Sequence, residues 1–316
     1  MSDTEHYVRD DVRGFLDMLE QIGNEGVEVV GAQEGRVQMR TLNAMAEAPA
    51  PDIAIKRDLA CPGPAGEIPL RLYDVRETRG PSPVIVFLHG GGFVIGDIGI
   101  YDSLCAHIAQ EMDLPVVSVE YRLAPEHPFP AAPDDCEAAA RWIATSPDAL
   151  GREVTGLIPM GDSAGGNLAI VVTNQLSGEP AQVPVVMQVP IYPVASDVSK
   201  HESLASFFDG YFLTGAAMAF FTDQYRADPA DPRTTPIIGD CSNTPPTVVC
   251  TCSLDPLRDS GREYAAHLIQ QGTDVTYLEF QGNIHGFITL RKAIPSGQQD
   301  IDRLLAAAKT MLRATA

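Results

Sequence analysis

The feature that most constrains the fold is one serine that stands between glycines, directly after an apolar run and directly before a helical pattern. The apolar run covers residues 157–160, Gly-Asp-Ser-Ala-Gly-Gly covers 161–166, and helical apolar spacing covers 168–176. Gly161 and Gly165 let neighbouring backbone pass close to Ser163 without meeting a Cβ atom. The pattern predicts a sharp strand–turn–helix unit with Ser163 at its tip, although a lone serine between glycines is also common in ordinary turns.

A second glycine-rich run, His89-Gly-Gly-Gly-Phe93, follows the apolar residues 84–88. Its glycines offer backbone N–H groups that no side chain covers, which is what a developing negative charge needs. Taken alone, such a triplet is also typical of a tight loop at the end of a strand. The order and setting of the two runs together favour one shared site.

Apolar runs alternate with helical patterns from about position 80 onward. Strands are predicted at 84–88, 116–119, 157–160, 185–192, 247–254 and 275–280, and helices at 101–112, 134–145, 168–176 and 261–271. Apolar strands separated by helices predict an α/β fold with a mostly parallel central sheet flanked by helices. Residues 67–73 alternate between polar and apolar, which predicts an antiparallel edge strand with one wet face.

Two segments do not fit this alternation. Residues 1–47 are expected to be helical, with one apolar face formed by Val8, Val12, Phe15, Leu16, Leu19 and Ile22. Residues 194–236 interrupt the sheet pattern and are rich in aromatic side chains. We expect these two segments, 1–47 and 194–236, to form a helical cap over a core made of 48–193 and 237–316. The sequence does not say which aromatic side chains face the core and which pack inside the cap.

Composition excludes several classes of function. The 316 residues carry 42 acidic and 22 basic side chains, a formal net charge of −20, which argues against binding to nucleic acid or to an anionic membrane. No apolar run is long enough to span a membrane. The start of the chain, residues 1–6, is polar and acidic rather than basic and then apolar, which predicts a cytoplasmic protein.

The six cysteines lack the spacing of a disulfide framework or of a metal site. Cys250 and Cys252 alternate inside an apolar run and are expected to face the same side of a buried strand. Core packing is therefore the favoured interpretation, and no metal is predicted.

A serine hydroxyl becomes a good nucleophile only when a base takes its proton. Ligands bind at the carboxyl ends of the strands in open α/β sheets, so the base should follow a strand. His285 follows the predicted strand 275–280 by a short loop, whereas His267 falls inside a helix and His201 lies in the aromatic insertion. His285 is the predicted base.

The acid that orients this imidazole should also follow a strand. Asp255 comes directly after 247–254 and is favoured, while its rival Asp259 stands where a helix-capping residue would. The N–H groups of Gly91, Gly92 and Ala164 are the predicted oxyanion hole. His89 and Phe93 are expected to hold the loop in shape, and Asp162 is expected to make local hydrogen bonds.

With these residues in place, the chain resembles the hormone-sensitive-lipase family of bacterial esterases, in its Gly-Asp-Ser-Ala-Gly subgroup. The resemblance rests on the motifs at 89–93, 121–130, 161–166, 255–259 and 285–287, in family order. It implies an α/β-hydrolase core with a cap, no cofactor, hydrolysis of short- to medium-chain carboxylic esters, and a homodimer. Glu120 and Ser260 depart from the family pattern and are expected to alter only loop hydrogen bonding, while 121–130, with its prolines and Arg122, braces a loop.

The leading hypothesis is a serine carboxylesterase that acts through an acyl-enzyme, with a small ester and water as its only partners. Two alternatives stay open at this point. An amidase or peptidase would use the same three side chains on a protonated amine leaving group. A small-molecule receptor on the same fold would bind without turnover, but such receptors have lost the histidine that this chain keeps as His285.

Overall fold

The computed structural model describes residues 6–23 and 25–315. The strands are β1 (Ile55–Gly63), β2 (Gly66–Asp74), β3 (Ser82–Leu88), β4 (Val116–Val119), β5 (Val154–Asp162), β6 (Val189–Ile191), β7 (Thr247–Leu254) and β8 (Val275–Ile284). The helices are α1 (Asp10–Ile22), α2 (Val27–Ala46), α3 (Asp102–Met112), α4 (Ala131–Ala144), α5 (Ala164–Gly178), α6 (Glu202–Ser206), α7 (Gly215–Tyr225), α8 (Arg258–Gln270) and α9 (Pro295–Thr315).

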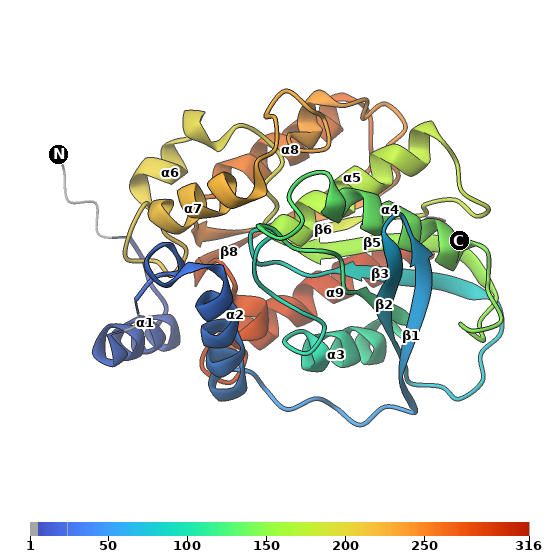
Figure 1. The fold of residues 1–316 in the computed structure, drawn as a ribbon, viewed down its shortest axis with the longest axis horizontal. Helices are drawn as coiled ribbons and strands as arrows, with labels where there is room; N and C mark the ends of the chain where they lie inside the picture. Colours follow the sequence, from blue (N-terminus) through green and yellow to red (C-terminus); the bar gives the residue numbers. More distant parts are fainter. Residues whose placement is uncertain (1–5, 24, 316) are drawn as a thin grey trace.

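The strands of the described chain form one eight-stranded sheet in the order β1-β2-β4-β3-β5-β6-β7-β8 (Figure 1). β2 is antiparallel to both β1 and β4, and every pairing from β4 to β8 is parallel. Helices α3 and α9 cover one face, while α4, α5 and α8 cover the other. The predicted mostly parallel sheet with helices on both sides is confirmed.

Two predictions about the sheet need correction, and one helix was missed. β2 is not an edge strand, because β1 pairs along its whole length; β1 escaped notice because most of its side chains are exposed, so it shows no apolar run. The strand expected at 185–192 is reduced to β6, with isolated bridges at Val185 and Gln188. Helix α9 was not predicted.

The N-terminal helical prediction is correct in kind but not in detail. Residues 10–46 form the helices α1 and α2, and Gly31 interrupts α2 with a φ of 80°. Val12 and Phe15 are buried as expected, whereas Ile22 is 56% exposed and does not belong to the apolar face. Residues 1–5, on which the cytoplasmic prediction drew, lie outside the described residues.

We call α1, α2, α6 and α7 the cap helices. They gather at the end of the molecule toward which the parallel strands run (Figure 1). Val12 and Phe15 of α1, Ala46 of α2 and Phe207 next to α6 share one apolar cluster with residues that follow β8. The two segments that broke the sequence alternation therefore lie over the carboxyl ends of the strands.

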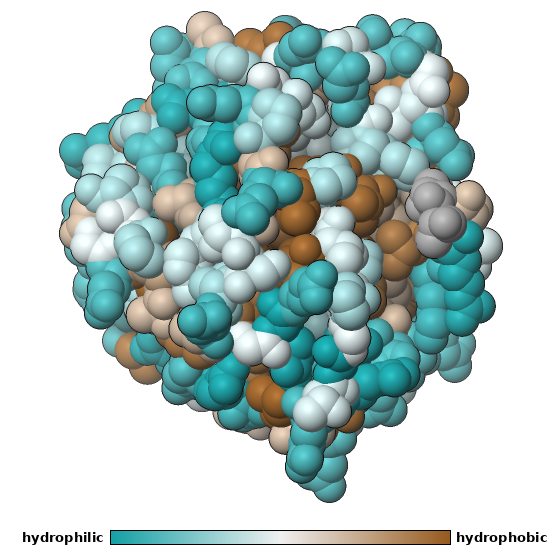
Figure 2. Space-filling model, turned by 90° about the vertical axis from the view of Figure 1, so that its right-hand side faces the viewer, coloured by the Kyte–Doolittle hydropathy of each residue, from teal (hydrophilic) through white to brown (hydrophobic). Residues whose placement is uncertain are grey.

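The side of the molecule opposite α1 is covered mainly by hydrophilic residues, with hydrophobic ones exposed in smaller groups (Figure 2). None of the helices in the described part of the chain is both long and apolar enough to cross a membrane.

The loop at 121–130 is braced by an ion pair between Arg122 and Asp135 of α4. Asp135 is buried and accepts hydrogen bonds from the backbone N, Nε and Nη2 of Arg122 at 3.0, 2.8 and 2.8 Å. A buried carboxylate that loses its cation stays desolvated without compensation. The ion pair therefore supports the bracing role that the sequence suggested for Arg122.

We expect Arg122→Ala to lower the free energy of unfolding by about 3 kcal/mol, because the buried Asp135 carboxylate then loses its ion-pair partner. Arg141→Ala is the matched control, since Arg141 pairs with Glu137 on the same helix in a more solvated setting and should cost less than about 1 kcal/mol. Urea unfolding followed by circular dichroism measures both variants. Equal losses would contradict the bracing role.

Candidate active site

Each predicted catalytic side chain belongs to the first residue after a parallel strand. Ser163 follows β5, Asp255 follows β7 and His285 follows β8. The predicted loop between β8 and His285 does not exist, because the strand continues through Ile284. Since the carboxyl ends of parallel strands meet at one edge, residues far apart in the sequence come together there.

His285 bridges the other two side chains. Its Nε2 lies 2.9 Å from Ser163 Oγ, and its Nδ1 lies 2.8 Å from Asp255 Oδ2. Asp255 is fully buried, and its second oxygen accepts the N–H of Leu257 at 2.7 Å. With Asp255 ionised, Nδ1 carries the proton and Nε2 is left to accept the hydroxyl proton of Ser163.

Ser163 sits on the sharp turn between β5 and α5 that the glycines predicted. Its φ of 56° and ψ of −118° place a non-glycine residue in a strained conformation that exposes its side chain. A Cβ on Gly165 would lie 1.9 Å from the carbonyl oxygen of Leu88, at the end of β3. Only glycine at position 165 therefore allows the turn to pack against β3.

The candidate oxyanion hole lies beside this turn. Gly91 has a φ of 117°, and a Cβ there would lie 2.1 Å from the carbonyl oxygen of Ile95, so a side chain is excluded. Ala164 begins α5, whose first N–H groups have no intrahelical acceptor. In the described part of the chain, the N–H groups of Gly91, Gly92 and Ala164 donate to no protein acceptor. Three unpaired donors thus belong to the nucleophile turn and to the loop that Gly90 joins to it through Asp162.

Asp162 does more than the sequence suggested, because its hydrogen bonds are long-range rather than local. Its buried carboxylate accepts the N–H of Gly90 at 2.8 Å and the hydroxyl groups of Tyr101 and Tyr192 at 3.1 and 3.3 Å. The Tyr192 ring lies 4.5 Å from that of His285. Asp162 therefore ties the glycine loop to the nucleophile turn and to the ring that packs on the base.

Burial sets the protonation of this network. It raises the pKa of Asp162, against the opposing effects of His285 and of the Tyr101 hydrogen bond. Burial also raises the pKa of Tyr101 and of Tyr192, so both hydroxyls keep their protons and donate. Neither tyrosine had a signal in the sequence, since each becomes significant only through its contact with Asp162.

The rival residues lie elsewhere. His267 is in the last turn of α8, and His201 Nε2 contacts Ser196 Oγ at 2.9 Å. Asp259 lies in the first turn of α8 and does not cap it. It accepts the N–H of Ser203 in α6 at 2.9 Å and pairs with Arg258 and Arg262. Its predicted capping role is wrong for α8, and it serves the start of α6 instead.

The two departures from the family motifs both serve loop hydrogen bonds, as expected. Glu120 Oε2 accepts the N–H of Ile98 at 2.7 Å. Ser260 Oγ accepts the N–H groups of Ala195 and Ser196 at 2.8 and 3.2 Å.

Two aromatic side chains of the insertion lie against the site. A Cβ on Gly92 would come within 2.3 Å of the Phe221 ring, and one on Gly286 within 2.9 Å of the Phe212 ring. Phe207 is instead buried in the cluster shared with α1, and Phe208 is 51% exposed. The question that the sequence left open is thus answered for Phe221 and Phe212.

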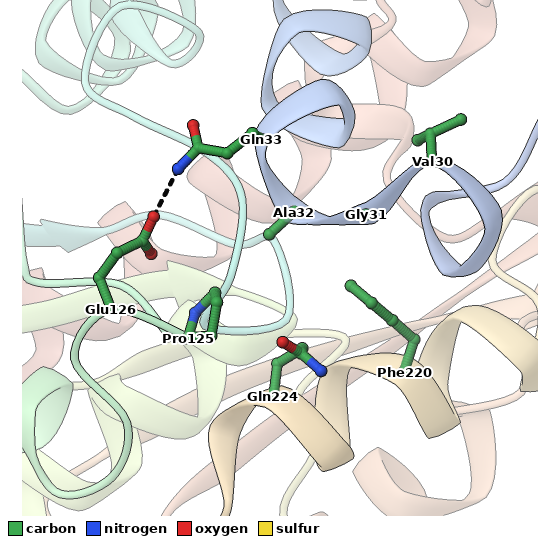
Figure 3. A pocket seen from close by; sticks show the side chains of 8 residues that line it. All are labelled: Val30, Gly31, Ala32, Gln33, Pro125, Glu126, Phe220 and Gln224. Atoms are coloured by element: carbon green, nitrogen blue, oxygen red, sulfur yellow. Dashed lines mark hydrogen bonds between the residues drawn. The ribbon is translucent and has the colours of Figure 1, made fainter.

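A groove of about 460 Å³ lies between α2 and α7 (Figure 3). Its lining residues are Val30, Gly31, Ala32, Gln33, Pro125, Glu126, Phe220 and Gln224. Gln33 and Glu126 join across it through a 2.5 Å hydrogen bond. Phe220 lines this groove, while its neighbour Phe221 lies on Gly92. The same turn of α7 therefore contacts both the groove and the glycine loop.

Within the described residues, no group of three or more His, Cys, Asp or Glu side chains is placed to hold a metal. The six cysteines are unpaired and buried.

Comparisons with known proteins identify the family. The family described as the alpha/beta hydrolase fold matches residues 85–289. An ethyl acetate hydrolase of Pseudomonas putida is 33% identical over 310 residues, which cover 94% of this chain and 97% of that protein. The carboxylic ester hydrolase LipN of Mycobacterium tuberculosis is 36% identical over 301 residues, 91% of this chain and 79% of that one.

Among solved structures, an ester hydrolase from the metagenome of Lake Arreo, in complex with a derivative of bipyridine phosphonate, has a TM-score of 0.90. It is 36% identical, and the alignment covers 96% of this chain and 98% of that one.

Gly165→Ala should slow the reaction of Ser163 with a fluorophosphonate probe by about 100-fold, because the added Cβ displaces the turn from β3. Gly178→Ala is the control on the same helix, since nothing lies within 4 Å of a Cβ there. Labelling rates of folded protein, read by intact mass, make the comparison. Unchanged labelling of Gly165→Ala would contradict the packing argument.

Proposed function

Because the chain belongs to the α/β-hydrolase fold family and is a carboxylic ester hydrolase, we propose that it cleaves esters through an acyl-enzyme formed on Ser163. The observation that carries the proposal is the placement of the His285 imidazole between Ser163 Oγ and Asp255 Oδ2, at 2.9 and 2.8 Å. These distances suit proton transfer from the hydroxyl and orientation of the ring at the same time.

In the first half-reaction, Ser163 Oγ attacks the ester carbonyl while His285 Nε2 accepts its proton. The carbonyl oxygen becomes an oxyanion that the N–H groups of Gly91, Gly92 and Ala164 stabilise; losing one such donor typically costs about 10² to 10³ in rate. Asp255 stabilises the imidazolium. The C–O bond to the alcohol then breaks, and the alcohol leaves with the proton from His285.

In the second half-reaction, His285 takes a proton from water, whose oxygen attacks the acyl carbon. The oxyanion forms in the same hole, the bond to Ser163 Oγ breaks, and the proton returns to Ser163. The carboxylic acid product then leaves the site. No cofactor enters any step of this proposal.

We propose short- to medium-chain acyl groups as the substrates, which the position of Phe221 supports. Its ring lies directly on Gly92, so a bulky acyl chain on that side of the oxyanion hole would meet an aromatic wall. The groove lined by Phe220 on the same turn of α7 offers room for the outer part of an ester.

The two alternatives are not favoured. The relatives are named for ester hydrolysis rather than for cleavage of amides. A receptor without turnover would not need the imidazole that His285 supplies next to Ser163.

Other parts of the account remain proposals. A cytoplasmic location is supported by the unpaired cysteines. The absence of nucleic-acid and membrane partners is supported by the net charge of −20. A homodimer follows only from the family resemblance. The division into cap and core at 47, 193 and 236 is supported by the two segments that interrupt the alternation of strands and helices and by the apolar cluster that they share with residues after β8.

Ser163→Ala should lower the kcat for p-nitrophenyl butyrate by about 10⁴-fold or more, because it removes the hydroxyl that His285 Nε2 contacts. Ser177→Ala, on the same helix, should keep the wild-type rate. An acyl-length series of p-nitrophenyl esters on both variants is the measurement. Substantial turnover by Ser163→Ala would refute the proposed nucleophile.

Activity should be lower at acidic pH, because a protonated imidazole cannot accept the Ser163 proton. The measurement is kcat/KM against pH for an uncharged ester, at constant ionic strength, with circular dichroism to verify folding at each pH. A profile that stays flat down to about pH 4 would count against His285 as the base.

Phe221→Ala should raise kcat/KM for long-chain esters relative to the butyrate by about tenfold or more, since removal of the ring widens the space beside Gly92. Phe208→Ala is the control, because Phe208 is an exposed phenylalanine of the same insertion. If both variants keep the wild-type preference for acyl length, Phe221 does not limit the chain.

A further inference from the structure

The N-terminal segment contacts the chain on both sides of the catalytic histidine. On the upstream side, Arg9 donates from its backbone N to Gly282 O at 3.2 Å and from Nε to Gln281 O at 2.8 Å. On the downstream side, Ala46 O at the end of α2 accepts the N–H groups of Lys292 and Ala293 at 2.9 and 3.0 Å. The start of α1 and the end of α2 thus bracket the segment that carries His285.

A buried polar chain continues from Arg9 to the residue before His285. Arg9 Nη1 donates to Asp300 Oδ2 at 2.6 Å, and Asn283 Nδ2 donates to the same oxygen at 2.9 Å. Asn283 Oδ1 accepts the N–H of Ile284 at 2.9 Å. Asn283 is fully buried and Asp300 is 3% exposed. Water therefore does not compete for the hydrogen bonds between these two side chains.

Further contacts join α1 and α2 to the residues around His285. Asp11 in α1 accepts the N–H and the hydroxyl of Ser296, at the start of α9, at 2.8 and 3.1 Å. At the other end, buried Glu47 pairs with buried Arg291. Between these ends, Val12, Phe15 and Ala46 share an apolar cluster with Ile284, Leu290 and Ile294.

We propose that Arg9, acting through Asp300 and Asn283, is a positioning residue for His285, so that the N-terminal part of the cap sets the alignment of the catalytic base as well as covering the site. The inference rests on the proposed function, because it assumes that His285 acts on Ser163. Displacement of a reacting group by about 1 Å can cost about 100-fold in rate. A tether one residue away from the base is therefore able to control kcat.

A double-mutant cycle tests this proposal with p-nitrophenyl butyrate. The variants are Arg9→Ala, Asn283→Ala and the double variant. Arg40→Ala is the matched control, because Arg40 joins α2 to the core residue Asp97 at 2.6 Å but has no contact with residues 281–294. Thermal unfolding of every variant separates loss of alignment from loss of fold.

We expect Arg9→Ala and Asn283→Ala each to lower kcat by about tenfold or more, with KM changed by less than about twofold. The double variant should be little worse than the worse single variant, because both changes break the same chain of hydrogen bonds. Arg40→Ala should keep the wild-type kcat. Combined with Asn283→Ala, it should leave the kcat equal to that of Asn283→Ala alone. Arg9→Lys, which keeps the cation beside Asp300, should recover part of the lost kcat and replaces Arg9→Ala in the cycle if the latter does not fold.

Three results would overturn the proposal: a folded Arg9→Ala with wild-type kcat, a rise in KM alone, which would assign Arg9 to substrate binding, or independent effects of Arg9 and Asn283. Failure of the proposed function looks different, because the wild type would then not hydrolyse the ester, or Ser163→Ala would still hydrolyse it.

Discussion

The pair of hydrogen bonds made by one imidazole is the interaction on which the rest of this structure depends. His285 can act as a base only while its Nδ1 is hydrogen-bonded to Asp255 and its Nε2 to Ser163, at 2.8 and 2.9 Å. The sheet supplies the coarse placement, because β5, β7 and β8 end at the same edge. The fine placement comes from packing that permits no side chain at Gly165 and from tethers on both sides of His285.

Buried polar groups around the site connect parts that would otherwise move independently. Asp162 joins the loop at Gly90 to Tyr101 and Tyr192, and Tyr192 packs on the base. Asp300 joins Arg9 to Asn283, two residues before His285. Buried networks of this kind stabilise one arrangement because any departure leaves a desolvated donor or acceptor without a partner. The oxyanion donors and the base are thus held in a fixed relation.

Sequence reasoning reached the parts of the site that depend on local signals. Ser163 and Asp255 come directly after apolar runs, and His285 follows one after a few residues. Glycines also mark the turns beside Ser163 and His285. It did not find Tyr101, Tyr192, Arg9 or Asn283, because their roles arise only from contacts between distant segments. β1 was missed because an exposed edge strand has no apolar run, and the length of β8 was missed because Gly282 and Asn283 resemble a loop.

The most direct test of the central claim is the rate at which a p-nitrophenyl phosphonate modifies the protein, with the modified residue located by peptide mass spectrometry. The account predicts a single adduct on Ser163 in the wild type. Its formation should be slower by about 10³-fold or more in His285→Ala and clearly slower in Asp255→Asn. An adduct on another residue, or modification of His285→Ala at the wild-type rate, would contradict the account.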